Sequence, residues 1–252
     1  MLGKAPWLAL GVGAYVAFTI AFFPATVAYR WFAPDEVRLA GVEGTLWSGQ
    51  AALGSVGELG LHEIEWELYP WSLLLARMSG QVQTRFSGGF LETGIRVGIG
   101  GTSFTELRAA TSLAALSGVL PIRGTQGQAS VNFAELVLRD GWPVGAIGEL
   151  RLGEVAVPPL VPVGNGGLIQ LGNYSINFGD ASGEGLAGTF TDQGGPLEVT
   201  GSLRLNPNRD YLIEGVVRAR PDADAALTQG LGFMTGEPDA SGMRTFSLVG
   251  SL

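Results

Sequence analysis

The sequence contains no cysteine and a single histidine, His62. The absence of cysteine excludes disulfide bonds and thiol chemistry as the basis of the fold or the function. One histidine without cysteine cannot supply the several ligands of a usual zinc site, so His62 is interpreted as a surface residue at the start of a strand. There is also no Gly-x-Ser-x-Gly element, and a serine nucleophile would have to recruit His62. We therefore expect no catalytic residue, no cofactor and no metal site, and we interpret the chain as a non-enzyme.

Charge is scarce, at 15% of residues, and acidic residues outnumber basic residues by 23 to 15, for a net charge of −8. A negative surface repels nucleic acid and anionic lipid headgroups, so neither is expected as a ligand on the basis of charge. Glu63, Glu65 and Glu67 alternate along one segment. Alternate residues of a strand lie about 6.6–7 Å apart, too far for one cation without other ligands. We interpret these carboxylates as a solvated strand face that resists aggregation.

A long run that is both uncharged and strongly apolar lies near the amino terminus, from Ala5 to Tyr29. Pro24 is expected to end or kink its helix, and the part before Pro24 still approaches the thickness of a bilayer core of about 30 Å. Trp7 lies near one boundary of the run, and Tyr29 and Trp31 lie near the other, where aromatic rings favour the membrane interface. The run predicts an uncleaved transmembrane anchor. A cleaved signal peptide is the alternative, although its apolar region is usually about 7–15 residues long.

The segment ahead of this anchor is short, and the basic residues on its two sides, Lys4 before it and Arg30 and Arg38 after it, nearly balance. The large carboxyl-terminal part is therefore the one expected to be translocated. The predicted organisation is a cytoplasmic stub at residues 1–4, a transmembrane anchor at residues 5–29 and a periplasmic β domain at residues 30–252.

Apolar and polar residues alternate with a period of two in many short segments beyond the anchor, and 40 glycines supply turns between them. The fold class predicted is mainly β: a single amino-terminal transmembrane helix, then a large curved antiparallel sheet with a few short helices. Short helices are expected at Pro70–Arg77, Thr111–Leu116 and Pro221–Leu231. The alternating segments include Ile64–Leu68, Val82–Phe86, Ile95–Ile99, Gln128–Phe133, Tyr174–Phe178, Leu197–Thr200, Phe246–Leu248 and Gly250–Leu252.

A sheet of more than about ten strands normally curls or splits so that its apolar faces meet. If it curls without closing, it leaves a hydrophobic trough that could hold an acyl chain or an apolar segment of a partner. The alternative is a closed sheet with a dry core, and the sequence leaves both open. The residues expected to line such a trough are Trp66, Val82, Phe86, Val131 and Phe133.

A distinctive element follows the anchor, with the sequence Gly44-Thr45-Leu46-Trp47-Ser48-Gly49. Its two glycines permit turns or close backbone approach. Leu46 and Trp47 are expected to point to opposite faces of a strand. For Trp47, packing in the core is preferred over contact with a partner.

This element is followed by Ile64–Pro70, by Leu73–Leu75 and, much later, by Gly194–Leu203, Tyr211–Gly215 and Leu231-Gly232. With one amino-terminal anchor, this order resembles protein N of the bacterial type II secretion system over nearly the whole chain. The resemblance implies a non-catalytic accessory component of the inner membrane, which acts in the periplasm by contacts with other secretion subunits. No active site can be carried over from it. A periplasmic groove protein that binds lipid or another hydrophobe is the alternative, and an envelope hydrolase is disfavoured.

Overall fold

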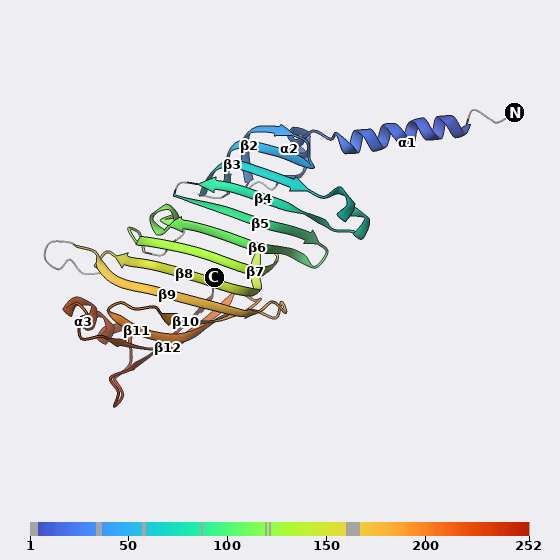
Figure 1. Cartoon of the computed structure of the whole chain (residues 1–252). Coiled ribbons are helices and arrows are strands. Elements are labelled where there is room, and N and C mark those ends of the chain that lie inside the picture. The colour runs from blue at the N-terminus through green and yellow to red at the C-terminus, as the bar shows by residue number, and fades with distance from the viewer. Residues whose placement is uncertain are drawn as a thin grey trace.

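The amino-terminal uncharged run forms two helices rather than one, and the rest of the chain is dominated by strands (Figure 1). The computed structural model describes residues 5–33, 37–56, 59–86, 88–118, 120, 122–159 and 167–251. The predicted stub at residues 1–4 and the terminal Leu252 lie outside these residues. The helices are α1 (Ala5–Ala21), α2 (Ala25–Phe32) and α3 (Ala225–Met234), with short 3-10 helices η1 (Pro70–Leu75) and η2 (Leu113–Leu116). The strands are β1 (Val37–Gly44), β2 (Ser48–Val56), β3 (Leu59–Leu68), β4 (Met78–Phe86), β5 (Gly89–Gly98), β6 (Gly101–Ser112), β7 (Gln126–Arg139), β8 (Trp142–Val157), β9 (Ile169–Asp180), β10 (Leu186–Asp192), β11 (Leu197–Leu205), β12 (Asp210–Ala219) and β13 (Arg244–Ser251).

All these strands form one 13-stranded sheet, in which each strand pairs antiparallel with the next strand along the chain. The sheet is open, with β1 and β13 as its edges. Because strand direction alternates, the connections fall at two opposite ends. We call the end that carries the β1–β2, β3–β4 and β5–β6 connections the α1 end, and the opposite end the far end. The predicted antiparallel sheet with few helices is confirmed.

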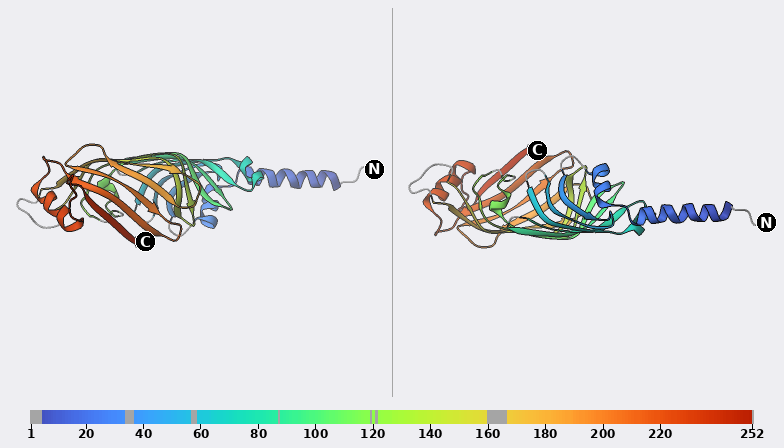
Figure 2. Two further views of the ribbon diagram at one scale, coloured as in Figure 1. Left: turned by 90° about the horizontal axis from the view of Figure 1, so that it is seen from below. Right: turned by 90° about the horizontal axis from the view of Figure 1, so that it is seen from above.

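One face of the sheet is apolar and lies on the inside of its curve. Val131 on β7 pairs with Ala109 and Leu150 on its two neighbouring strands, and the same register row continues to Leu91, Ile176 and Phe190. The sheet curls so that β1 and β13 turn toward the same side (Figure 2). The short helix η2 lies on that side, with its buried Leu113 packed against Ala129 and Val155. The apolar side chains are therefore gathered on the concave face.

The opposite face carries a polar residue at every strand along one register row. Carboxylates and amides alternate at the start of this row, where Gln50 stands between Glu43 and Glu65, and Gln83 stands between Glu65 and Glu92. Like charges directly opposite each other destabilise a sheet, and the intervening amides prevent this pairing. The row reads Glu43, Gln50, Glu65, Gln83, Glu92, Arg108, Asn132, Glu149, Asn177, Thr189, Ser202, Glu214 and Ser247.

Helix α1 ends at Ala21, and α2 begins after Pro24, whose extended backbone precedes the new helix. Proline cannot continue a helix from the preceding turn, so the predicted break is confirmed, two residues earlier than expected. Among the residues that the structure describes, no helix is both long enough and apolar enough to cross a membrane. The anchor expected over residues 5–29 stays a prediction.

The three expected short helices are present with shifted bounds. The first is the 3-10 helix η1, in which proline takes the first helical position. The second shortens to η2, because β6 extends through Ser112 and the Ser112 hydroxyl accepts a hydrogen bond from the amide of Ala115. The third begins later than expected, as α3. All three lie in connections between strands, and they leave most of the concave side of the sheet uncovered (Figure 2).

Candidate functional site

The Gly44–Gly49 element forms the connection between β1 and β2, so Leu46 and Trp47 do not lie in a strand as expected. Thr45 and Ser48 close the turn reciprocally, since the Thr45 amide donates to the Ser48 carbonyl (2.9 Å) and the Ser48 amide donates to the Thr45 hydroxyl (3.1 Å). Gly44 has a positive φ of 88°, and a Cβ there would come within 2.6 Å of the Ser48 carbonyl oxygen. Only glycine fits this position, which is why the chain turns here.

This turn is bonded directly to the helical segment that precedes the sheet. The Leu46 amide donates to the Phe23 carbonyl (2.8 Å), and the Trp47 indole N–H donates to the Ile20 carbonyl in the last turn of α1 (2.7 Å). Pro24 and Thr45 form an isolated antiparallel bridge next to the first of these contacts. The last carbonyls of a helix have no partner within it, and the Trp47 N–H supplies a donor to one of them, that of Ile20. The direction in which α1 leaves the sheet is thereby fixed.

Two further contacts anchor the turn to the sheet. The Trp66 indole N–H donates to the Leu46 carbonyl (3.1 Å), and the Leu68 amide donates to the Trp47 carbonyl (2.6 Å). Gly49 permits the first contact, because a Cβ there would stand 2.5 Å from the Trp66 ring. The Trp47 ring is half-buried and its N–H contacts α1. The preferred core position for Trp47 is therefore wrong, and its contact lies within the chain.

Helix α2 continues this junction along the edge strand β1. The Tyr29 hydroxyl accepts a hydrogen bond from the Leu39 amide (2.9 Å) and donates to the Val37 carbonyl (3.3 Å), while Ala25 and Ala28 are buried. An open sheet edge invites pairing with another chain, and these contacts occupy part of the β1 edge. We call the end of α1, α2 and residues 44–49 the helix–hairpin junction. Hydrogen bonds join the end of α1 to residues 44–49, and they join α2 and residues 44–49 to the first strands of the sheet.

All five residues expected to line a trough lie on the apolar, concave face. Phe133 is buried in a core cluster with Phe178, at a ring-centroid distance of 5.5 Å, and Val131 packs against this cluster. Trp66 and Val82 face each other across β3 and β4 and are half-buried. Phe86 is buried at the far end of β4. The structure therefore brings Val131 and Phe133 together and places the other three nearer the β1 edge. Whether this face holds a ligand stays a prediction.

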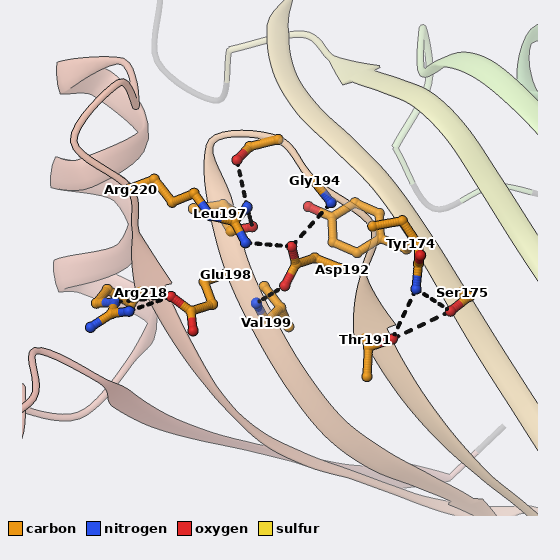
Figure 3. Close-up of polar contacts among 12 residues, drawn as sticks. Tyr174, Ser175, Thr191, Asp192, Gly194, Leu197, Glu198, Val199, Arg218 and Arg220 are labelled. Carbon is orange, nitrogen blue, oxygen red and sulfur yellow. Dashed lines mark hydrogen bonds and ion pairs between the residues drawn. The ribbon is translucent and has the colours of Figure 1, made fainter.

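A second polar centre, which the sequence did not predict, ties the far end together (Figure 3). The Asp192 carboxylate accepts hydrogen bonds from the Val199 amide (2.9 Å), the Gly194 amide (3.2 Å) and the Arg220 guanidinium (2.7 Å). Arg220 also donates to the carbonyls of Gly195 (2.6 Å) and Leu197 (2.8 Å). We call this set the far-end lock. It joins the β10–β11 turn to the end of β12.

The lock sets the ionisation of two side chains. Burial by itself raises the pKa of Asp192, but the hydrogen bonds from Val199, Arg220 and Gly194 outweigh burial and lower this pKa below its ordinary value. Burial, together with the nearby Asp192 charge, raises the pKa of Tyr174 to about 12. The Tyr174 hydroxyl donates to the Leu171 carbonyl (2.6 Å). Both groups keep their ordinary charge at neutral pH and act as structural partners.

The isolated histidine and the alternating glutamates are on exposed surface. Glu63 has a positive φ of 48° at a bulge in β3 and pairs with Arg85 (3.0 Å), and His62 is exposed. Glu65 and Glu67 line a shallow depression of about 540 Å³ on the polar face, beside the helix–hairpin junction. Over the described ranges, no group of three or more histidine, cysteine, aspartate or glutamate side chains is arranged to hold a metal ion.

The chain matches the family model for type II secretion system (T2SS) protein N over residues 35–247. It belongs to the type II secretion system protein N family. It is 31% identical over 245 residues to a type II secretion system protein N from Aeromonas hydrophila, with 93% of each chain covered. It is 26% identical over 230 residues to the protein of that name from Vibrio cholerae serotype O1, with 87% of this chain and 86% of the relative covered. No solved structure matches the chain. The resemblance found in the sequence is confirmed, and family membership indicates a component of type II secretion.

Proposed function

We propose that this protein is a membrane-anchored, non-catalytic accessory component of the type II secretion machinery, acting in the periplasm through contacts with other secretion subunits. In this proposal residues 1–4 form a cytoplasmic stub, residues 5–29 form the inner-membrane anchor and residues 30–252 form the periplasmic domain. The observation that carries the proposal is the helix–hairpin junction, which joins an uncharged helix rigidly to the sheet.

Helix α1 has the surface expected of a segment surrounded by lipid. Its 17 residues carry no charge and extend for about 25 Å, which is close to the lower limit for a membrane span. Leu10, Tyr15 and Phe18 are 66%, 73% and 65% exposed. Large apolar side chains exposed along a projecting helix are unfavourable in water and favourable in a bilayer. The helix projects away from the sheet in each view (Figures 1 and 2).

The remaining surface suits contact with proteins. The polar row on the convex face presents carboxylates, amides and hydroxyls at regular spacing along all strands. Such groups favour specificity in binding through hydrogen bonds and complementary charge. The rigid junction holds this face in a constant orientation to the anchor, which a scaffold between membrane and periplasmic subunits requires.

Topology and attachment are tested by fusing a reporter that is active only outside the cytoplasm after Leu252 in the full chain. We expect reporter activity in intact cells and retention of the fusion in membranes after alkaline carbonate washing. In a strain without this protein, we expect reduced release of a type II substrate, restored by the wild-type chain. A cytoplasmic signal, release of soluble protein or unchanged substrate release contradicts the proposal.

A second candidate function, binding of lipid or another hydrophobe in the concave face, is favoured by the half-exposed apolar rows of an open sheet. Val131→Asp places a carboxylate on this face, whereas Asn132→Asp places one on the polar face of the same strand. If the face is a wet trough, Val131→Asp abolishes binding of an apolar probe and leaves the fold intact. If it is a closed core, Val131→Asp unfolds the domain because a lone buried carboxylate is costly. If the purified wild-type chain carries no co-extracted lipid and binds no apolar probe, binding of a hydrophobe is excluded as the function.

A further inference from the structure

The connections at the α1 end of the sheet change from apolar to polar along the series of strands. Its first three connections carry Leu46 and Trp47, then the η1 segment, then Ile99. Its last three connections are polar, and their residues include Asp140, Ser182, Glu184, Asn206, Asn208 and Arg209. Apolar tips are therefore confined to the part of this end next to α1.

The η1 segment exposes its apolar side chains although its backbone forms a regular 3-10 helix. Trp71, Leu74 and Leu75 are 79%, 83% and 65% exposed. Their neighbour Ser72 is buried, and its hydroxyl donates to the Tyr69 carbonyl (2.6 Å). Folding has thus turned the one polar side chain of the segment inward and the large apolar ones outward.

Backbone contacts connect this segment to the helix–hairpin junction and to the next apolar tip. Leu68, which precedes η1, donates to the Trp47 carbonyl beside the end of α1. Arg77, which follows η1, lies beside Gly98, because a Cβ on that glycine would stand 3.9 Å from the Arg77 Cβ. Ile99, adjacent to Gly98, is fully exposed. The end of α1, η1 and the β5–β6 connection, which carries Ile99, therefore lie in sequence along one end of the sheet (Figure 1).

We infer that Trp71, Leu74, Leu75 and Ile99 form a second membrane contact, which inserts into the bilayer surface beside α1; this inference rests on the proposed anchoring by α1. Three observations favour lipid as the occupant. The patch lies at the same end of the sheet as an uncharged helix, its side chains are tryptophan, leucine and isoleucine, and the exposed Arg77 beside it suits anionic headgroups. Two contacts set apart along the sheet would hold its α1 end against the membrane surface, in addition to the orientation that the helix–hairpin junction gives.

The natural absence of cysteine permits a direct test in the full chain. Leu74→Cys labels the patch, Leu10→Cys labels α1 and Ile122→Cys labels the far end. Each variant is given an environment-sensitive fluorophore and reconstituted into phosphatidylethanolamine–phosphatidylglycerol vesicles that contain lipids with a nitroxide on the acyl chain. These side chains are 83%, 66% and 40% exposed, so a label displaces little at any of them.

We expect the nitroxide to quench the Leu74 label to an extent similar to the Leu10 label and to leave the Ile122 label bright. Quenching at Leu10 without quenching at Leu74 overturns the second contact and leaves the anchor intact. Quenching at neither position overturns the anchor and with it this inference. An unquenched Leu74 label that becomes shielded from an aqueous quencher only when other secretion subunits are present overturns lipid in favour of a protein partner.

Discussion

The two ends of the same sheet are built in opposite ways. At the α1 end, the turn at residues 44–49 is held by backbone groups and by two tryptophan N–H groups, and the neighbouring tips are exposed and apolar. At the far end, the turn at residues 193–196 is held by Asp192 and Arg220, and the surrounding segments carry charges. Among the described residues, an ion pair fixes the turn at residues 193–196, whereas no ion pair is seen at the turn of residues 44–49. The difference is what the proposed function predicts, in which the two ends lie in different surroundings.

The largest effect is expected where both ends depend on the same core. Phe133→Ala removes a buried ring from the central cluster and should lower the free energy of unfolding by about 3 kcal/mol. The free energy is measured by urea unfolding. Amide hydrogen exchange of the variant should show that the backbone amides at both ends of the sheet lose protection together. Phe90→Ala is the control, since Phe90 is 41% exposed and should cost much less. Loss of protection at one end alone would show that the two ends of the sheet unfold independently, which contradicts a shared core.

The next effect should be confined to the far end. Arg220→Gln leaves the largely buried Asp192 carboxylate without its cation. It should lower the free energy of unfolding by roughly 2 kcal/mol. Arg218→Gln removes the neighbouring pair with Glu198, in which both side chains are more exposed, and should cost about 0.5 kcal/mol. Equal losses in chemical denaturation of the two variants would show that the far-end lock has no special role.

Trp47→Phe should produce a smaller effect at the α1 end. It keeps an aromatic ring but removes the hydrogen bond to Ile20, at a cost of about 1 kcal/mol. Hydrogen exchange should quicken at the end of α1 and remain unchanged around Asp192. Trp71→Phe is the matched control, because no hydrogen bond of the Trp71 ring is seen in the described structure and the ring is exposed. Faster exchange at the far end would contradict the separation of the two ends.

Acid should lower, by a small amount, the stability that Asp192 contributes at the far end. The pKa of Asp192 is lower in the folded state than the ordinary value of 3.8, so the unfolded state binds this proton more readily. The stabilisation is present above pH 3.8 and is lost as the pH falls through the folded-state value. Urea unfolding of wild type and Asp192→Asn should therefore differ at pH 7 and converge in strong acid. A difference that persists in acid would assign the effect to packing rather than charge.

The strands could be predicted from the alternation of apolar and polar residues, because each strand has one face turned to the core. Val82–Phe86 and Tyr174–Phe178 both lie within observed strands. The turn at Leu46 and Trp47 could not be predicted, because it depends on bonds to Ile20 and Phe23, more than twenty residues away along the chain. The same holds for the far-end lock, because Asp192 ends β10 whereas its partner Arg220 directly follows β12, 28 residues along the chain. Local patterns indicate which face is buried, but not which distant groups meet.

The central claim is that the α1 end faces the bilayer and the far end faces the periplasm. The most direct measurement is the rate at which a membrane-impermeant maleimide reacts with single cysteines in spheroplasts that carry the full chain. Ile99→Cys reports the α1 end, and Ala240→Cys reports the exposed α3–β13 connection at the far end. The account predicts fast labelling of Ala240→Cys and slow labelling of Ile99→Cys, with detergent removing the difference. Equal rates at the two positions, or labelling of Ala240→Cys only after the membrane is broken, would contradict it.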